Sequence, residues 1–146
     1  MLFRSLNIPA LIPDDYLPDV NNRLIMYKRL ASAEQEEHLH ELQVEMIDRF
    51  GLLPEPLKHL VAVTQLRLRA ESLGITRIDA NAQGARIHFS AKPAVDPLTI
   101  VQLVQRHPDR YRLQGASELK LTVAMPQAEQ RIREVSALLD VLQGSP

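Results

Sequence analysis

The 146-residue chain contains no cysteine and no tryptophan, and aromatic residues make up only 4% of it. Without cysteine, the chain can form no disulfide, no thiol nucleophile and no thiolate metal site. No apolar run approaches the roughly 18 residues of a membrane span, and the N-terminus, Met-Leu-Phe-Arg, lacks the pattern of a signal peptide. We therefore expect a cytoplasmic protein whose core consists of Leu, Ile, Val and Ala.

An excess of charge is also missing, because the formal net charge is −1. A free-standing nucleic-acid-binding domain usually carries a basic excess, since contacts with phosphates dominate its affinity. The charge balance therefore disfavours that role without excluding it. Apolar residues still make up 45% of the chain, which is enough for a folded domain with its own core.

Helical patterns fill the first half of the chain. Residues 1–18 contain prolines that exclude a helix interior, so we expect an extended lead-in or tether there. The first predicted helix runs from about Asp19, a capping residue, to Leu30. Its apolar side chains fall close to one face of the helix: Val20, Leu24, Tyr27 and Leu30.

Two further helices follow almost at once. Ser32, with Gln35 three residues later, has the pattern of a capping box for the second helix. Gly51 lies where a left-handed C-cap is expected. The third helix is predicted from Pro54, a favoured first residue, to Leu73, before Gly74.

The pattern then changes from helical to alternating. Residues 75–81 and 85–90 are predicted to form a hairpin around Asn81-Ala82-Gln83-Gly84. Asp96-Pro97 starts a fourth helix that ends before Pro108, and residues 111–113 and 119–123 form a second strand pair. Pro126 opens the last helix, which has a clear amphipathic stripe. The order, three helices followed by β-β-α-β-β-α, predicts a single α+β domain over residues 19–143, with a small sheet covered by helices.

A search for catalytic and ligand-binding motifs finds none that converge. The five glycines are scattered and form no phosphate-binding loop, and neither HExxH nor GxSxG occurs. His38 and His40 lie two residues apart on a helix and do not face the same way. We expect no catalytic residue, no metal and no cofactor. A small enzyme that uses Asp14, Asp15 or the histidines is kept as an alternative.

A basic cluster suggests a second alternative. Arg67, Arg69 and Arg77, with Arg86 and Lys92 nearby in sequence, have no interleaved aromatic residues on which bases could stack. A solvated face is the favoured interpretation. The alternative is a nucleic-acid-contacting accessory module in which Arg67, Arg69 and Arg77 contact phosphates.

The second predicted helix has the most informative charge pattern. At about 100° per residue, its apolar side chains fall within an arc of roughly 80° and predict a buried stripe: Leu39, Leu42, Met46 and Phe50. A charged group lies beside that stripe: Glu41, Glu45, Asp48 and Arg49. These charges form either a solvated face, with a favourable i,i+4 pair between Glu45 and Arg49, or the polar rim of an interface.

Three consecutive blocks carry a family resemblance: Ile8–Leu24, Tyr27–Ala33 and Val44–Pro54. The last block contains the distinctive Ile-Asp-Arg-Phe-Gly. In this order the blocks resemble the C-terminal domain of bacterial transcription-repair coupling factors. The resemblance covers about residues 8–142, although the part from Ile75 onward is similar in layout more than in motif.

The resemblance implies a function that belongs to a longer protein. Members of this family are ATP-driven DNA translocases that remove stalled RNA polymerase and recruit the excision-repair protein UvrA. Their C-terminal domain packs on an N-terminal UvrB-like module and masks the UvrA-binding surface. The resemblance places Glu45, Asp48 and Arg49 in that contact, with Met46 as a mild departure. It implies a monomeric regulatory domain without catalysis, in which RNA polymerase and DNA are contacted by domains outside this chain.

Overall fold

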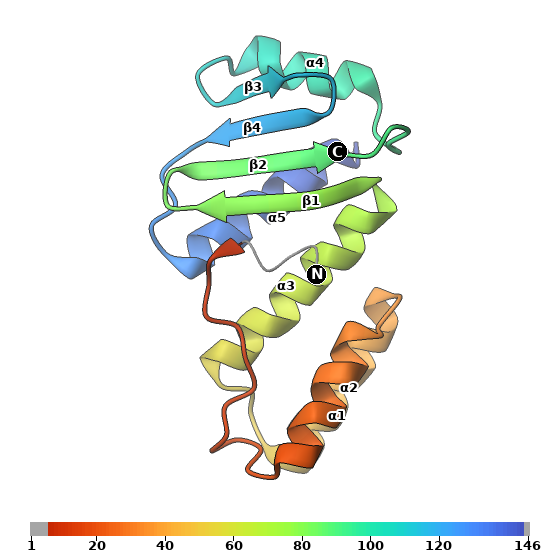
Figure 1. Cartoon of the computed structure of the whole chain (residues 1–146), viewed down its shortest axis with the longest axis vertical. Helices are drawn as coiled ribbons and strands as arrows, with labels where there is room; N and C mark the ends of the chain where they lie inside the picture. The colour runs from red at the N-terminus through yellow and green to blue at the C-terminus, as the bar shows by residue number, and fades with distance from the viewer. Residues whose placement is uncertain (1–5, 145–146) are drawn as a thin grey trace. The chain divides into compact units, whose positions relative to one another are not determined.

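The structure, a computed structural model, describes residues 6–144, so residues 1–5 of the predicted lead-in lie outside the described part. The chain forms two compact units (Figure 1). We call residues 8–68 the helical unit, and residues 1–7 together with 69–146 the sheet unit. The predicted boundary between a lead-in (residues 1–18) and a domain (residues 19–143) stays a prediction. The contacts within the chain instead divide it after residues 7 and 68.

The helical unit consists of three helices and the extended segment that precedes them. Its helices are α1 (Val20–Ala31), α2 (Glu36–Phe50) and most of α3 (Glu55–Ser72), whose last turn belongs to the sheet unit. Buried side chains from all of these parts form one core: Ile12, Leu17, Met26, Leu30, Leu39, Leu42, Met46, Leu53, Leu57, Val61 and Leu68. Because Ile12 and Leu17 belong to this core, the extended segment is packed and contributes to the stability of the unit.

The start of α1 is as predicted, whereas its buried face is not. Asp19 caps the helix by accepting a hydrogen bond from the Asn21 amide at 3.0 Å. Leu30 is buried, but Val20 and Leu24 are 57% and 60% exposed. The helix buries Met26 instead, which lies one turn before Leu30 on the same side. The predicted face was wrong because α1 has apolar residues on two sides. Helical periodicity alone does not determine which of the two sides packs against the rest of the unit.

The predicted capping box at the start of α2 was also wrong. α1 continues to Ala31, so the amide of Ser32 donates to the Lys28 carbonyl at 2.9 Å and Ser32 becomes the C-cap of α1. Gln35 is the N-cap of α2 and makes no side-chain capping bond. The box requires Ser32 to begin α2, and Ser32 ends the preceding helix.

The sheet unit has the predicted β-β-α-β-β-α order. Its elements are β1 (Ile75–Asn81), β2 (Gly84–Phe89), α4 (Pro97–Arg106), β3 (Tyr111–Gln114), β4 (Glu118–Thr122) and α5 (Ala128–Leu142). The strands form one antiparallel sheet in the order β1-β2-β4-β3. Helix α5 lies across one face of the sheet (Figure 1). The α+β fold is therefore confirmed.

Local sequence determines the β1–β2 turn and the start of α5. In the β1–β2 hairpin, the Asn81 side chain accepts a hydrogen bond from the Gln83 amide at 2.8 Å. Gly84 follows with φ +153°, and a Cβ atom there would collide with the Leu121 carbonyl of β4. α5 begins two residues after Pro126, with a capping box between Gln127 and Gln130.

Asn7 and Arg69, the residues of the sheet unit that precede and follow the helical unit in sequence, both contact α5. The side-chain amide of Asn7 donates to the Ala80 carbonyl of β1 at 2.7 Å, and the backbone carbonyl of Asn7 accepts a hydrogen bond from Arg131 of α5. Arg69 donates to Ser136 and forms an ion pair with Asp140, both also on α5. None of the described helices is long and apolar enough to cross a membrane.

Candidate interaction surface

The charged residues predicted on α2 lie beside its buried stripe. Leu39, Leu42 and Met46 are buried and Phe50 is partly buried, so the predicted stripe is confirmed. The neighbouring charged side chains differ in exposure. Glu41, Asp48 and Arg49 are exposed and Glu45 is half-buried.

Glu45 is the centre of a three-residue ion-pair network. Arg29 of α1 donates two hydrogen bonds to its carboxylate, 2.6 Å to Oε2 and 2.9 Å to Oε1. Arg49 donates a third, at 3.2 Å to Oε2. The Arg29 hydrogen bonds and charge lower the pKa of Glu45 to about 2 and raise the pKa of Arg29. The carboxylate is therefore ionised at neutral pH, and its two oxygens are occupied within the molecule.

Sequence reasoning did not find Arg29. The i,i+4 spacing identified Arg49 as a partner of Glu45, but a contact between helices depends on how α1 packs against α2. The only available signal was the pair of basic residues, Lys28 and Arg29, in the last turn of α1. Such residues favour the C-terminal end of a helix in any case.

An aromatic contact fixes the C-terminal end of α2. The Tyr16 hydroxyl lies 2.8 Å from the Gly51 carbonyl oxygen and 3.1 Å from that of Met46, so its single hydrogen is donated to the end of α2, where Gly51 offers the nearer acceptor. Burial raises the pKa of Tyr16. Its ring meets Phe50 edge-on at 6.1 Å, and the Arg49 guanidinium lies 4.9 Å from the centre of the Phe50 ring. These contacts limit where the Arg49 charge can lie.

Gly51 has the positive φ predicted for it but not the left-handed helical conformation. Its φ of +98° is combined with a ψ of −173°, so the chain leaves α2 extended and does not fold back. This region of backbone conformation is open essentially to glycine alone. The extended exit places the Gly51 carbonyl within reach of Tyr16.

Two carboxylates of the group have no internal partner of opposite charge. Neither Glu41 nor Asp48 forms a salt bridge with another of the residues that the structure describes. Ile25, 55% exposed, lies one helical turn before Arg29 on the same side of α1. We call the set Ile25, Arg29, Glu41, Glu45, Asp48 and Arg49 the α1–α2 surface.

The basic residues predicted as phosphate contacts are engaged within their own units. In the helical unit, Arg67 donates to the carbonyls of Ala31 and Ala33 at 3.1 and 3.2 Å, near the end of α1. In the sheet unit, Arg69 is largely buried against α5. Arg77 forms an ion pair with Asp79 at 2.9 Å. Their role as phosphate contacts stays a prediction, and each guanidinium has a partner within its own unit.

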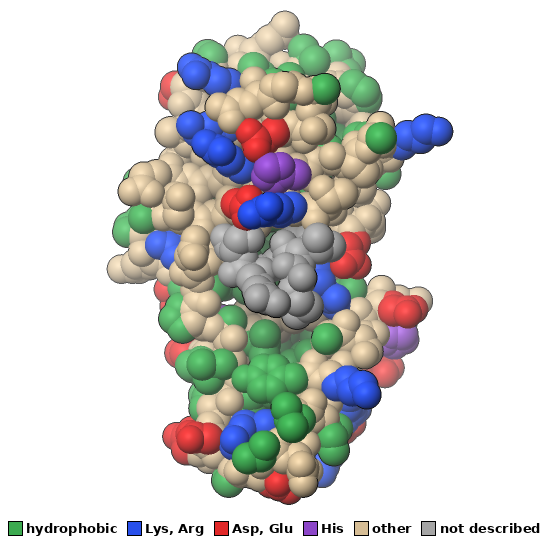
Figure 2. All heavy atoms as spheres, viewed as in Figure 1, with side chains coloured by type: hydrophobic (Ala, Val, Ile, Leu, Met, Phe, Trp, Pro, Cys, Tyr) green, Lys and Arg blue, Asp and Glu red, His purple; other side chains and the backbone are tan. Residues whose placement is uncertain are grey.

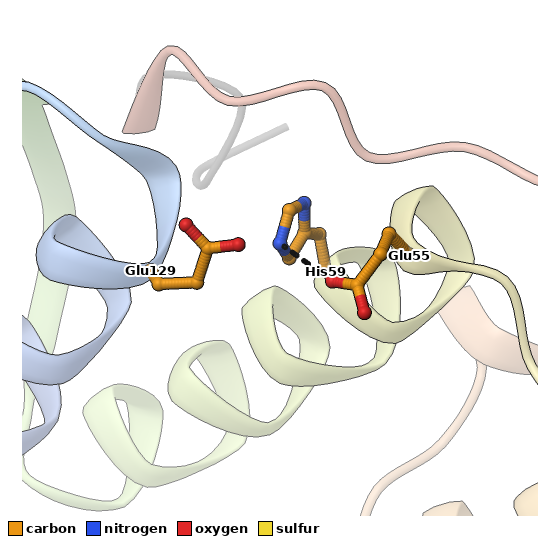
Figure 3. Close-up of side chains that lie close together, drawn as sticks. All are labelled: Glu55, His59 and Glu129. Atoms are coloured by element: carbon orange, nitrogen blue, oxygen red, sulfur yellow. Dashed lines mark ion pairs between the residues drawn. The ribbon is translucent and has the colours of Figure 1, made fainter.

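The aspartates of the enzyme alternative and His59 lie in different elements of the helical unit. Asp14 and Asp15 are exposed in a turn of the extended segment. His59 Nδ1 lies 3.2 Å from the Pro9 carbonyl oxygen, and His59 Nε2 lies 3.7 Å from the carboxylate of Glu55, one turn earlier on α3 (Figure 3). These contacts fix His59 between α3 and the extended segment of the helical unit.

Comparisons with known proteins identify the family. The TRCF domain family model matches residues 6–100. The transcription-repair-coupling factor of Haemophilus influenzae is 49% identical over 92% of this chain, and that of Escherichia coli K12 is 43% identical over 95%. The chain spans 12% of the length of each of these two relatives. A solved C-terminal domain of transcription-repair coupling factor has the same fold, with a TM-score of 0.73 and 20% identity over 97% of this chain and 93% of that one. The chain therefore belongs to the TRCF domain family of transcription-repair coupling factors.

Proposed function

We propose that this chain is an autoinhibitory domain of a transcription-repair coupling factor that acts in nucleotide excision repair. Its α1–α2 surface packs on the N-terminal UvrB-like module of the same protein and masks the surface that UvrA binds. The observation that carries the proposal is the pair of exposed carboxylates, Glu41 and Asp48, next to a network in which Glu45 is already neutralised. Those two carboxylates are available to cations of a partner.

The composition of the surface suits a contact that must open. Exposed ion pairs contribute only about 0–1 kcal/mol each, so a rim of charges gives specificity with little affinity. Ile25 supplies an apolar side chain beside the charges, as the centre of an interface requires. Because the partner module is on the same polypeptide, a local concentration on the order of millimolar compensates for the low affinity.

The domain is regulatory on this proposal, and catalysis belongs to other parts of the protein. The motor that hydrolyses ATP, the RNA polymerase contact and the principal DNA contact all lie outside this chain. Opening requires a ligand that binds the open state more tightly than the closed one, as UvrA does by competing for the masked surface. The isolated chain is accordingly expected to be monomeric and to show no ATPase activity above buffer.

Charge reversal in the full-length protein tests the proposal. Asp48→Arg combined with Glu41→Arg reverses the charge of both exposed carboxylates and leaves the side chains of Arg29, Glu45 and Arg49 unchanged. Glu45→Arg is a poor choice, because it would bring three cations together and weaken the contact between α1 and α2. We expect the double variant to retain about tenfold more UvrA in a pull-down, which corresponds to a loss of about 1.4 kcal/mol from the closed state.

The matched control is Glu34→Arg combined with Glu71→Arg. Both residues are exposed and make no salt bridge with another described residue, and the change in net charge is the same. This control is expected to bind UvrA like the wild type. If the Asp48/Glu41 variant is folded and captures no more UvrA than the control does, the α1–α2 surface is not the masking contact.

A further inference from the structure

Three cations stand in a row across the face of the sheet that is turned away from α5. Arg86 of β2 is directly opposite Lys120 of β4, and Lys120 is directly opposite Arg112 of β3. Neighbouring strands lie about 4.8 Å apart, so the row is about 10 Å long. Charged side chains are visible over this sheet in Figure 2. We call Arg86, Lys120 and Arg112 the cation row.

The carboxylates near the row, Asp79 and Glu118, form their ion pairs with residues outside it. The Glu118 carboxylate lies 3.4 Å from His88 Nε2. Asp79 is opposite Arg86 in register, but its carboxylate lies 2.9 Å from the Arg77 guanidinium and 3.3 Å from His88 Nε2. No salt bridge joins a cation of the row to another of the described residues 6–144. Like charges directly opposite each other destabilise a sheet. Lys120 therefore has a like charge directly opposite it on each neighbouring strand, an arrangement that an external anion would stabilise.

The surface beside the row is hollowed on both sides of Lys120. A depression of about 360 Å³ is lined by Arg86 and Lys120, with polar groups of Asn81 and Gln83 and the carboxylate of Asp79. A second, of about 270 Å³, is lined by Lys120 and Arg112 together with Arg110, Asp109, Tyr111 and Thr122. Lys120 thus lines both depressions, with Arg86 on one side and Arg112 and Arg110 on the other.

We propose that the cation row binds the phosphate backbone of a nucleic acid duplex. Two guanidinium groups flanking an ammonium match a chain of phosphates, because arginine can bind a phosphate with two parallel hydrogen bonds. The charge is complementary, and each of the two depressions has room for a phosphate and its hydrogen-bonding neighbours.

The other side chains on this face favour a duplex over other anionic partners. The outward positions of the described strands are occupied by polar and charged residues, among them His88, Gln114 and Thr122. Tyr111, which borders the second depression, is in register with the buried Leu121 and so belongs to the opposite face of the sheet. A single strand would require aromatic rings for base stacking. An acidic protein would require a large apolar side chain as an anchor at the centre of the contact. Contact with phosphates alone needs neither.

Binding of labelled DNA to the purified chain tests this proposal. Fluorescence anisotropy with a fluorescein-labelled duplex of about 20 base pairs is expected to give a Kd on the order of 10⁻⁴–10⁻⁶ M, with a slope of log K against log salt of about −2.7 for three phosphate contacts. Arg86→Gln, Lys120→Gln and Arg112→Gln together are expected to reduce the affinity at least tenfold and to bring the slope close to zero. The single variant Lys120→Gln, at the centre of the row, is expected to reduce the slope by about 0.9.

A matched triple variant separates the row from net charge. Lys92→Gln, Arg106→Gln and Arg133→Gln neutralise three exposed cations of the same unit at positions outside the cation row. This control is expected to keep most of the affinity. The row variant is expected to be as thermally stable as the wild type or more so, because it removes repulsion between like charges.

Several results would overturn the proposal. These are no binding of the duplex by the wild type at low salt, equal losses in the row and control variants, or tighter binding of a single strand of the same length. Displacement of the duplex by polyglutamate at equal charge concentration would assign the row to acidic proteins instead. The outcome is independent of the proposed masking function, because the row variant leaves the α1–α2 surface intact and should capture UvrA like the wild type in the full-length protein.

Discussion

Removing the hydroxyl of Tyr16 probes how the end of α2 is held. In Tyr16→Phe the ring and its edge-on contact with Phe50 are retained, while the one hydrogen bond that the hydroxyl donates to the Gly51 and Met46 carbonyls is lost. A net hydrogen bond contributes about 0.5–1.5 kcal/mol, so we expect the free energy of unfolding to fall by about 1 kcal/mol. For a chain of this size, that corresponds to a decrease of roughly 2–4 °C in Tm.

Urea denaturation followed by circular dichroism measures this change. The midpoint should move to lower urea with little change in slope, because the surface exposed on unfolding is almost the same. Tyr111→Phe is the matched control: no side-chain hydrogen bond of Tyr111 is seen among the described residues, so its removal should change stability by less than about 0.5 kcal/mol. Equal stability of Tyr16→Phe and the wild type would refute the assignment of Tyr16 as the cap of α2.

Two further predictions concern the same helix. The pKa of Glu45 is lowered from 4.5 to about 2, so its ionised form stabilises the fold above pH 4.5 and this contribution is lost as the pH falls towards 2. Glu45→Gln should therefore reduce the change in the free energy of unfolding between about pH 5 and pH 2. Urea midpoints measured at several pH values test this, and a pH profile equal to that of the wild type would contradict the ion-pair network. Met46 is 1% exposed, so Met46→Ala should cost about 2–5 kcal/mol in urea denaturation, whereas a loss below about 1 kcal/mol would mean that α2 does not pack as described.

The sequence predicted the elements better than their packing. The glycine and proline signals around Gly51, Pro54 and Asp96-Pro97 placed helix ends within a residue or two, because caps and turns depend on local chemistry. The buried face of α1 was wrong, since Met26 and Leu24 are equally apolar and only the position of α2 decides which is buried. The predicted capping box at Ser32 was wrong for a related reason. The connection between α1 and α2 is short, and Ser32 ends α1 and so cannot begin α2.

The candidate sites show the same limit. The wheel of α2 placed Glu41, Glu45 and Asp48 beside the buried stripe, because residues on one helix have a fixed angular relation. Arg29 was missed because it reaches Glu45 from another helix. The cation row was missed for a stronger reason. Lys120 and Arg112 are neighbours only through strand register, and Arg86 joins them through a strand order that is not the order of the sequence.

The attachment of both Asn7 and Arg69 to α5 makes the helical unit an insertion between two anchored points. A truncation that starts at Ile8 looks harmless in the sequence, yet it would remove the buried Leu6 and the Asn7 contacts from the sheet unit. Conversely, the helical unit can unfold locally between its anchors while the sheet unit keeps its own hydrogen bonds. Amide hydrogen exchange should then divide the chain into two cooperative blocks at the junctions near residues 7 and 69, with α3 protected to different degrees along its length.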